Sequence, residues 1–319
     1  MSNGPQAQQD TGHGTRPAGD APSSNGKAPR KMDSRELGLV LAQQLCDMQD
    51  LHYGLWEPDI PVTLTNVPVA QQRYTDNLLG ALAAAAPAPA RVLDIGCGSG
   101  HVMVQLLERG YRVDGVIPSA ALADMVRGRV GRRVGQGEGC DTRVFECRFE
   151  DLSVAEAGTY DVALFSESFQ YMVMDEAFAQ LERLVVPGGH VVICDFFRSE
   201  HDGDGGFGDR SFRGGKKWTD FQELLADSSF DVVRDDDITR LVSPSLELMH
   251  DLLTNRVGPA GATLGRYMRD NHPVASWLGS RLFRGKWKKL RFKYFSGRRS
   301  REVFERYKTY HLLVLRRRA

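Results

Sequence analysis

The chain has 319 residues, 41% of them hydrophobic and 26% charged, with equal numbers of basic and acidic side chains. These values are typical of a soluble globular protein with a sizeable core. No apolar run is long enough to span a bilayer and no signal peptide opens the chain, which predicts a cytoplasmic protein. The five cysteines contain no Cys-x-x-Cys pair, so we expect reduced thiols and no metal site.

The first part of the chain is predicted to be a disordered tail. Residues 1–33 are rich in Gly, Pro, Ser, Gln and Asn and have almost no large apolar side chain, so they cannot bury enough surface to offset chain entropy. Order should begin near Asp33 or Ser34, a plausible helix N-cap. Apolar residues with helical spacing follow at Leu37, Val40, Leu41, Leu45 and Met48.

The most informative segment runs from Arg91 to Gly100. An apolar strand carries Asp94 near its end and leads directly into alternating glycines at Gly96, Gly98 and Gly100. Glycine permits positive φ and close approach of the backbone to a ligand. The helix that follows would point its first unpaired N–H groups at the same place. The segment therefore predicts a strand, a tight turn and a helix that together cradle a ligand.

Strands and helices alternate from this segment to about residue 197. Strands are expected at Arg91–Ile95, Arg112–Ile117, Thr142–Cys147, Asp161–Phe165 and His190–Phe196. Helices are expected at Val102–Glu108, Ala120–Val130 and Glu176–Leu184, with a turn at Pro187-Gly188-Gly189 that ends the last one. This alternation predicts a doubly wound α/β sheet, whose ligands bind beyond the carboxyl ends of the strands.

The Asp94-x-Gly96-x-Gly98-x-Gly100 spacing resembles motif I of the class I S-adenosylmethionine (SAM)-dependent methyltransferases. The resemblance implies a Rossmann-like seven-stranded sheet, with the glycine loop and Cys97 wrapped around the methionine end of SAM. It also implies an N-terminal helical lid (34–90), a SAM-binding core (91–245) and a final strand (306–319). Residues 246–305 match no part of the family, and we expect them to form a helical, basic substrate-covering insertion.

The same resemblance nominates further cofactor residues at two strand ends. Ile117 stands where the family usually has an acid that holds the ribose hydroxyls, so Ser119 is expected to offer a hydroxyl instead. Glu150 and Asp151 are both candidates to accept a hydrogen bond from the adenine amine, and the sequence does not separate them.

The residues after the fourth strand narrow the resemblance. Glu167-Ser168 with Met172 is similar to a pattern in the small-molecule branch that contains rebeccamycin sugar, tocopherol and geranyl diphosphate methyltransferases. This implies that Ser166 contacts the cofactor and that Glu167 acts as a general base or stabilises a carbocation. Tyr171 and His52 are weaker catalytic candidates.

An aromatic motif upstream of the glycine loop agrees with this branch. His52-Tyr53-Gly54-Leu55-Trp56 is similar to its aromatic-aromatic-glycine signature, which implies that Tyr53 closes over the methionine carboxylate. For Trp56 we expect ordinary core packing.

The net charge of zero hides a strong asymmetry. Residues 281–319 contain 15 Lys and Arg but only the two acids Glu302 and Glu305. This segment is either a solvated helical face or a surface for an anionic partner: a membrane, an acidic carrier protein, or an anionic substrate that Arg298-Arg299 would contact. No RNA-binding module is recognisable, which argues against nucleic acid.

The sequence thus predicts an enzyme that uses SAM to methylate oxygen, carbon or nitrogen of a small or lipid-like metabolite, in natural-product or isoprenoid metabolism. One alternative is an RNA or protein methyltransferase guided by the basic segment, although no Asn/Asp-Pro-Pro-Tyr tetrad follows the fourth strand. The other is a non-catalytic SAM-fold binding protein, against which the intact glycine loop argues.

Overall fold

The computed structural model describes residues 48, 50, 52–134, 141–201, 214–274, 276–278, 281, 285 and 300–319. The predicted disordered tail, the helical run from Leu37 to Leu45 and the proposed anion contact Arg298-Arg299 lie outside these residues.

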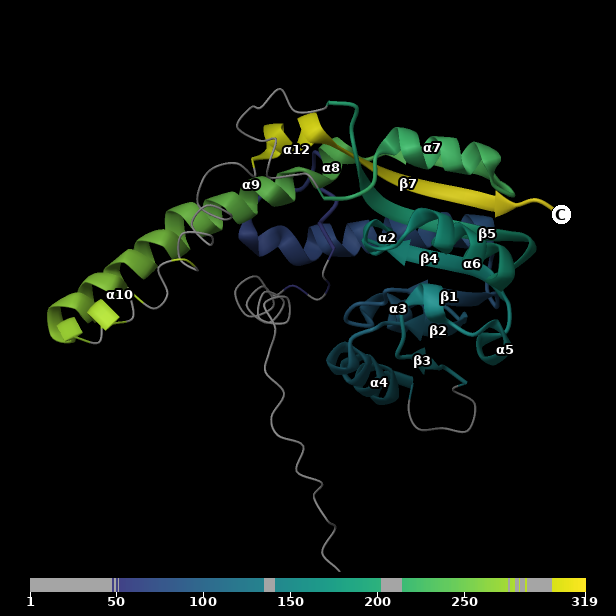
Figure 1. Cartoon of the computed structure of the whole chain (residues 1–319), viewed down its shortest axis with the longest axis horizontal. Helices are drawn as coiled ribbons and strands as arrows, with labels where there is room; N and C mark the ends of the chain where they lie inside the picture. Colours follow the sequence, from purple (N-terminus) through teal and green to yellow (C-terminus); the bar gives the residue numbers. More distant parts are fainter. Residues whose placement is uncertain are drawn as a thin grey trace, which may run out of the picture.

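The core of the molecule is a seven-stranded sheet with the order β3-β2-β1-β4-β5-β7-β6 (Figure 1). Its strands are β1 (Arg91–Ile95), β2 (Arg112–Val116), β3 (Val144–Phe145), β4 (Tyr160–Ser166), β5 (Val185–Arg198), β6 (Phe230–Asp237) and β7 (Lys308–Arg317). The first five are parallel, and β7 runs antiparallel between β5 and β6. The predicted doubly wound, seven-stranded fold is confirmed.

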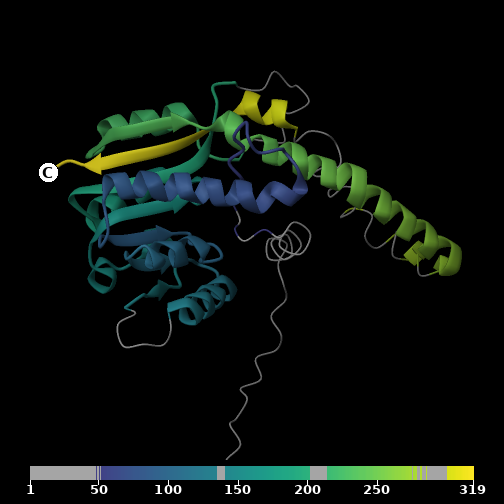
Figure 2. The same cartoon turned by 180° about the vertical axis from the view of Figure 1, so that it is seen from behind.

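Helices cover both faces of this sheet. The described α-helices of the chain are α2 (Val67–Ala85), α3 (His101–Glu108), α4 (Ala120–Val134), α5 (Val154–Ala157), α6 (Met174–Leu184), α7 (Trp218–Asp227), α8 (Thr239–Val242), α9 (Pro244–Asp251), α10 (Gly258–Asn271) and α12 (Arg301–Tyr307). Three 3-10 turns, Leu64–Asn66, Phe149–Asp151 and Phe169–Tyr171, and a π-helix, Leu252–Val257, complete the set. Figure 2 shows α2 along one face of the sheet.

Two hydrophobic clusters lie on the opposite faces of the sheet. Val92 packs in the cluster that includes residues of α2, α3 and α4, whereas its neighbour Leu93 packs with α6 and α7. Successive side chains of a strand point to opposite faces, and both faces are covered by helices, so the parallel strands are mostly apolar.

Two strands differ from the expected bounds. The expected turn at Pro187-Gly188-Gly189 lies inside β5, because β5 begins at Val185 directly after α6 and the glycines form a bulge in its pairing with β4. Gly188 has a φ of 77°, which supplies the local change of direction. Strand β3 contains only Val144 and Phe145, since it pairs with β2 over just two residues.

A helical arm extends away from the sheet (Figures 1 and 2). It consists of α9, the π-helix and α10 in direct succession, and α10 has no buried residue. The described residues from 246 to 278 are almost all helical, but α10 does not pack on the core. The substrate-covering role expected for residues 246–305 stays a prediction.

Candidate functional site

The predicted glycine loop joins β1 to α3 in a left-handed backbone. Gly96, Gly98 and Gly100 have φ values of 74°, 53° and 77°, which disfavour any residue with a Cβ. A Cβ at Gly96 would lie 2.5 Å from the Cβ of Ser168, and one at Gly100 would lie 3.1 Å from Val126. The loop is therefore held between two neighbouring elements and turns the first N–H groups of α3 toward the carboxyl edge of the sheet.

Asp94 lies beneath this loop with an unsatisfied oxygen. The residue is 2% exposed, and its Oδ2 has no hydrogen-bond partner among the described residues. Burial, helped by the negative charge of Asp50, raises the pKa of Asp94 to about 7. A buried, unpartnered carboxylate costs free energy unless a cation or a donor meets it, so a positively charged group would fit beside this atom.

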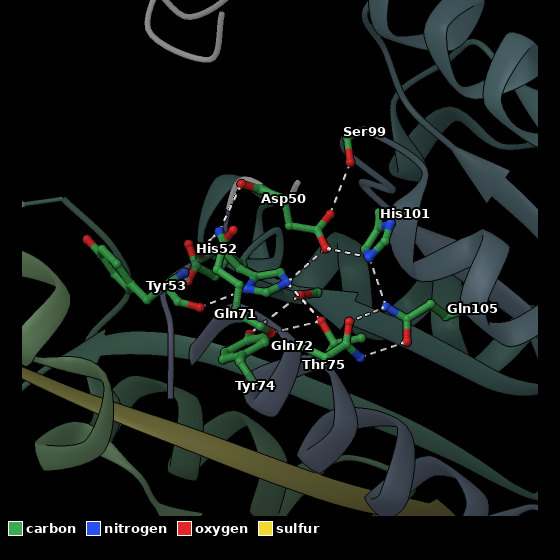
Figure 3. A network of polar contacts seen from close by, with 12 residues as sticks. Asp50, His52, Tyr53, Gln71, Gln72, Tyr74, Thr75, Ser99, His101 and Gln105 are labelled. Carbon is green, nitrogen blue, oxygen red and sulfur yellow. Dashed lines mark hydrogen bonds and ion pairs between the residues drawn. The ribbon is translucent and has the colours of Figure 1, made fainter. Parts of the chain in front are cut away.

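Asp50 is the centre of a polar network over the loop (Figure 3). Ser99 Oγ donates to its Oδ1 at 3.0 Å, and the Nε2 atoms of His52 and His101 lie 3.2 and 4.0 Å from its Oδ2. Burial opposes ionisation of Asp50, but the hydrogen bond and charge of His52 outweigh it and lower the pKa of Asp50. The sequence analysis missed this residue, although it stands only two positions before the aromatic motif.

His52 is a buried residue and not one exposed to a substrate. It is 4% exposed, its Nδ1 donates to the carbonyl of Tyr53 at 2.8 Å, and its ring stacks on Tyr74 at 4.1 Å. Burial lowers the pKa of His52, yet Asp50 more than compensates and raises it overall. The imidazole therefore fixes the segment that carries Asp50 and Tyr53.

Glu167 occupies a strained position at the end of β4. It has a φ of 53°, the only positive value of a non-glycine residue in the described part of the chain. Its Oε1 accepts hydrogen bonds from the backbone N–H of Tyr53 at 2.7 Å and from the hydroxyl of Tyr310 at 2.9 Å. Burial raises the pKa of Glu167, and these donors offset the shift only in part.

Aromatic side chains surround this carboxylate. The rings of Tyr53 and Phe304 are 6.1 Å apart, and those of Tyr53 and Tyr310 are 6.2 Å apart, both edge to face. The Tyr74 hydroxyl lies 2.9 Å from that of Tyr310, which links α2 to β7. Tyr53 therefore lies beside Glu167, and its contact with the methionine carboxylate of SAM stays a prediction, while Tyr74 and Tyr310 were not foreseen.

The other predicted cofactor residues follow the ends of β1, β2 and β4. Cys97 is 7% and Ile117 4% exposed. The Ser119 hydroxyl accepts the N–H of Leu122 at 3.5 Å, at the first turn of α4. Ser166 Oγ lies 3.4 Å from the hydroxyl of Tyr74, and Ser166 directly precedes Glu167 in the chain.

The structure distinguishes the two adenine candidates. The Glu150 side chain is 8% exposed and pairs with Arg148 at 3.0 Å, whereas Asp151 is exposed. Burial raises the pKa of Glu150, but hydrogen bonds and Arg148 lower it overall. Tyr171 is 70% exposed, in contrast to the enclosed Glu167. Trp56, expected in the core, is indeed buried and donates to Ser245 at 2.8 Å.

Two buried ionisable residues near this edge carried no sequence signal. Asp195 is fully buried in β5 and accepts the N–H of Gln170 at 3.0 Å, and burial raises its pKa to about 8. Lys308, at the start of β7, is 2% exposed, donates to the carbonyl of Gly214 and lies over the ring of Phe196. Burial lowers the pKa of Lys308 to about 7. Asp195 thus anchors the turn that follows Glu167.

The described residues contain neither a membrane-spanning helix nor a cluster of metal-ligating side chains. No helix there has the length and apolar character needed to cross a membrane. No three His, Cys, Asp or Glu side chains there converge as metal ligands would.

Comparison with known proteins places this geometry in a family. The model of the methyltransferase domain matches residues 69–234, just over half of the chain. The chain is 31% identical over 155 residues to the S-adenosyl-L-methionine-dependent Diels-Alderase iccD of Talaromyces variabilis, covering 46% of this chain and 49% of the relative. It is 28% identical over 117 residues to the sterol 4-C-methyltransferase strm-1 of Caenorhabditis elegans, covering 35% of this chain and 33% of the relative. The matches therefore span half or less of these curated relatives.

A solved structure agrees over more of the length. The geranyl diphosphate C-methyltransferase of Streptomyces coelicolor A3(2), in complex with Mg2+, geranyl-S-thiolodiphosphate and S-adenosyl-L-homocysteine, superposes with a TM-score of 0.60. The superposition covers 87% of this chain and 91% of that one at 17% identity, which shows a common fold. From the family match and this shared fold we conclude that the chain belongs to the methyltransferase domain family and has the class I, Rossmann-like methyltransferase fold.

Proposed function

We propose that this protein is a SAM-dependent methyltransferase that methylates oxygen, carbon or nitrogen of a small or lipid-like metabolite. The observation that carries the proposal is the unpartnered Oδ2 of Asp94, buried under three left-handed glycines. SAM has a positively charged ammonium and a positively charged sulfonium, and these charges match the unpartnered carboxylate oxygen of Asp94.

The residues around the cradle suit the methionine end of SAM. Gly96, Gly98 and Gly100 give the backbone close access to it, and Asp94 and Asp50 supply negative charge beneath and above the loop. Ile117 offers an apolar contact at the end of β2, so the ribose hydroxyls would rely on neighbours such as Ser119. Glu150, rather than the exposed Asp151, suits the adenine amine because it is the enclosed carboxylate of the pair.

When bound, SAM supplies a methyl group on a positively charged sulfur, which an acceptor displaces in line. The chain's part is to hold the acceptor in line and exclude water. Glu167 is fixed by Tyr53 and Tyr310 at the end of β4, and its raised pKa suits a group that takes a proton from a hydroxyl or amine acceptor. At an alkene carbon the same carboxylate would stabilise positive charge.

The aromatic side chains beside Glu167 favour a lipid-like or aromatic acceptor. Tyr53, Phe304 and Tyr310 pack edge to face around it, and a wall of this kind binds apolar groups and cations alike. The sterol methyltransferase among the relatives acts on a substrate of this class by its name.

Calorimetry and methyl transfer test the proposal separately. SAM should bind the wild-type protein and bind Asp94→Ala at least about tenfold more weakly. Incubation with methyl-labelled SAM and a host extract should then yield a labelled small molecule, and Glu167→Gln should reduce its formation while it still binds SAM.

Absence of SAM binding to the wild type would refute the cofactor. If SAM binds but no extract component becomes labelled, the proposed methyl transfer is refuted. That result would favour a SAM-dependent enzyme that catalyses a cyclisation, as the name of the relative iccD describes.

A further inference from the structure

The helical arm presents an apolar stripe that nothing in the described structure covers. Leu264, Tyr267 and Met268 follow one another at the i, i+3, i+4 spacing of one helix face. They are 62%, 57% and 37% exposed. Arg266, Arg269 and Asp270 fall on the opposite side of the same helix by the same spacing. Helix α10 is therefore amphipathic, although it does not pack on the core.

A second group of exposed apolar side chains follows the end of α10, and the Arg281 guanidinium lies over the ring of one of them, Trp277. Val274, Trp277 and Leu278 are 78%, 59% and 53% exposed. Tryptophan and tyrosine are the side chains preferred at the boundary between lipid and water, because they combine an apolar ring with a polar group. Large apolar patches of this kind mark interaction sites on soluble domains.

Helix α10 lacks the tertiary packing that stabilises most helices of its length. Helices of about 12–15 residues are marginal in water and owe most of their stability to packing. All 14 residues of α10 lack a buried side chain. A surface that covers the stripe would supply the missing stabilisation.

The charge of residues 256–299 indicates which kind of surface would cover the apolar stripe. Residues 256–299 contain 12 Lys and Arg against the single acid Asp270, a balance of +11. Two copies of such a segment repel each other, whereas a negatively charged lipid surface attracts it. We infer that α10 docks its Leu264, Tyr267 and Met268 stripe on the surface of an anionic lipid bilayer, with the helix lying in the plane of the interface.

Docking at this place would hold the catalytic edge of the sheet near the lipid. Ser245, in the first turn of α9, accepts hydrogen bonds from the N–H of Gly54 at 3.1 Å and from Trp56 at 2.8 Å. The base of the arm is therefore tied to the segment that carries Tyr53 (Figure 1). The inference concerns the surface alone and does not depend on methyl transfer.

Sedimentation of the full chain with lipid vesicles tests the inference. The wild type should bind vesicles of equal parts phosphatidylcholine and phosphatidylglycerol, and bind pure phosphatidylcholine and high-salt samples more weakly. The double variant Leu264→Glu/Met268→Glu should lose at least about tenfold in vesicle affinity, because each charge replaces an inserted apolar group.

The matched control adds the same charge to the other side of the helix. Ala262→Glu/Arg266→Gln changes the charge by the same two units at two exposed residues on the opposite face of α10 and should stay within about threefold of the wild type. Circular dichroism and SAM-dependent thermal shift should be equal in all three proteins, which shows that only the surface has changed.

Three results would overturn the inference. One is a wild type that stays in the supernatant with anionic vesicles, and another is a control pair that loses as much affinity as the stripe pair. The third is a wild-type dimer in light scattering that the stripe pair alone dissociates, since the stripe would then be an interface between copies.

Discussion

Asp94→Asn is expected to flatten the pH dependence of SAM binding. Asp94 has a pKa of about 7 in the free protein, and it must be ionised to meet a cationic ligand. At pH 6 about one tenth of the molecules carry the carboxylate, so affinity should be about tenfold lower than at pH 8, or about 1.4 kcal/mol. The asparagine variant should bind weakly at both pH values.

The same substitution should stabilise the protein without cofactor. A carboxyl whose pKa is higher in the folded than in the unfolded state costs the fold free energy above the unfolded value, and the cost grows as the pH rises from about 4 to about 7. A rise from 3.8 to about 7 sets a ceiling of about 4 kcal/mol on the gain in unfolding free energy above pH 7. Below pH 4 the two proteins should unfold alike.

Calorimetry from about pH 5.5 to 8.5 measures the affinity for SAM, and urea unfolding from about pH 3.5 to 8.5 measures the stability. Asp50→Asn is the control, because the charge of Asp50 raises the pKa of Asp94, so its removal should move the inflection to lower pH rather than abolish it. A small slope shared by wild type and Asp94→Asn would belong to His52, whose pKa is also raised. An inflection of wild-type size in Asp94→Asn would refute the role of Asp94.

Three further predictions concern the loop, the carboxylate and the buried lysine. Gly96→Ala should lower the unfolding free energy by about 1–3 kcal/mol in urea, since its Cβ would lie 2.5 Å from that of Ser168 at a φ of 74°, whereas Gly80→Ala, in open space on α2, should be neutral or stabilising. Tyr310→Phe removes a donor that lowers the pKa of Glu167, so the acidic limb of the turnover profile should move to higher pH; an unmoved limb would contradict this role. Lys308 has a pKa lowered to about 7, so it costs stability below about pH 10 and most below pH 7. Lys308→Met should therefore raise the melting temperature more at pH 6 than at pH 10, and equal shifts at both would count against the buried charge.

The sequence predicted what is encoded in neighbouring residues. The glycine loop is recognisable because three glycines after a buried strand have few structural alternatives, and all three do adopt positive φ. The parallel strands were found because both faces of the sheet are covered, which makes them mostly apolar. Pro187-Gly188-Gly189 was placed in a turn because those residues favour turns, but pairing with β4 continues past them.

What the sequence did not reveal depends on residues brought together from distant segments. Asp50 meets Ser99 across 49 positions, and Tyr74 meets Tyr310 across 236. Neither pair has a spacing that a local pattern can report. The buried Asp195 and Lys308 lie in strands whose polar positions look like ordinary surface alternation until the register is known.

The position of β7 between β5 and β6 has a consequence for biosynthesis. Strand β6 pairs only with β7, which follows it by about seventy residues of chain. A ribosome will therefore have released β6 long before its partner exists, and β5 will present an open edge during that interval. The hydroxyl of Tyr310 also reaches Glu167 only after residue 310 has been synthesised. A nascent chain arrested before residue 308 should thus expose unpaired strand edges and aggregate more readily than the full chain.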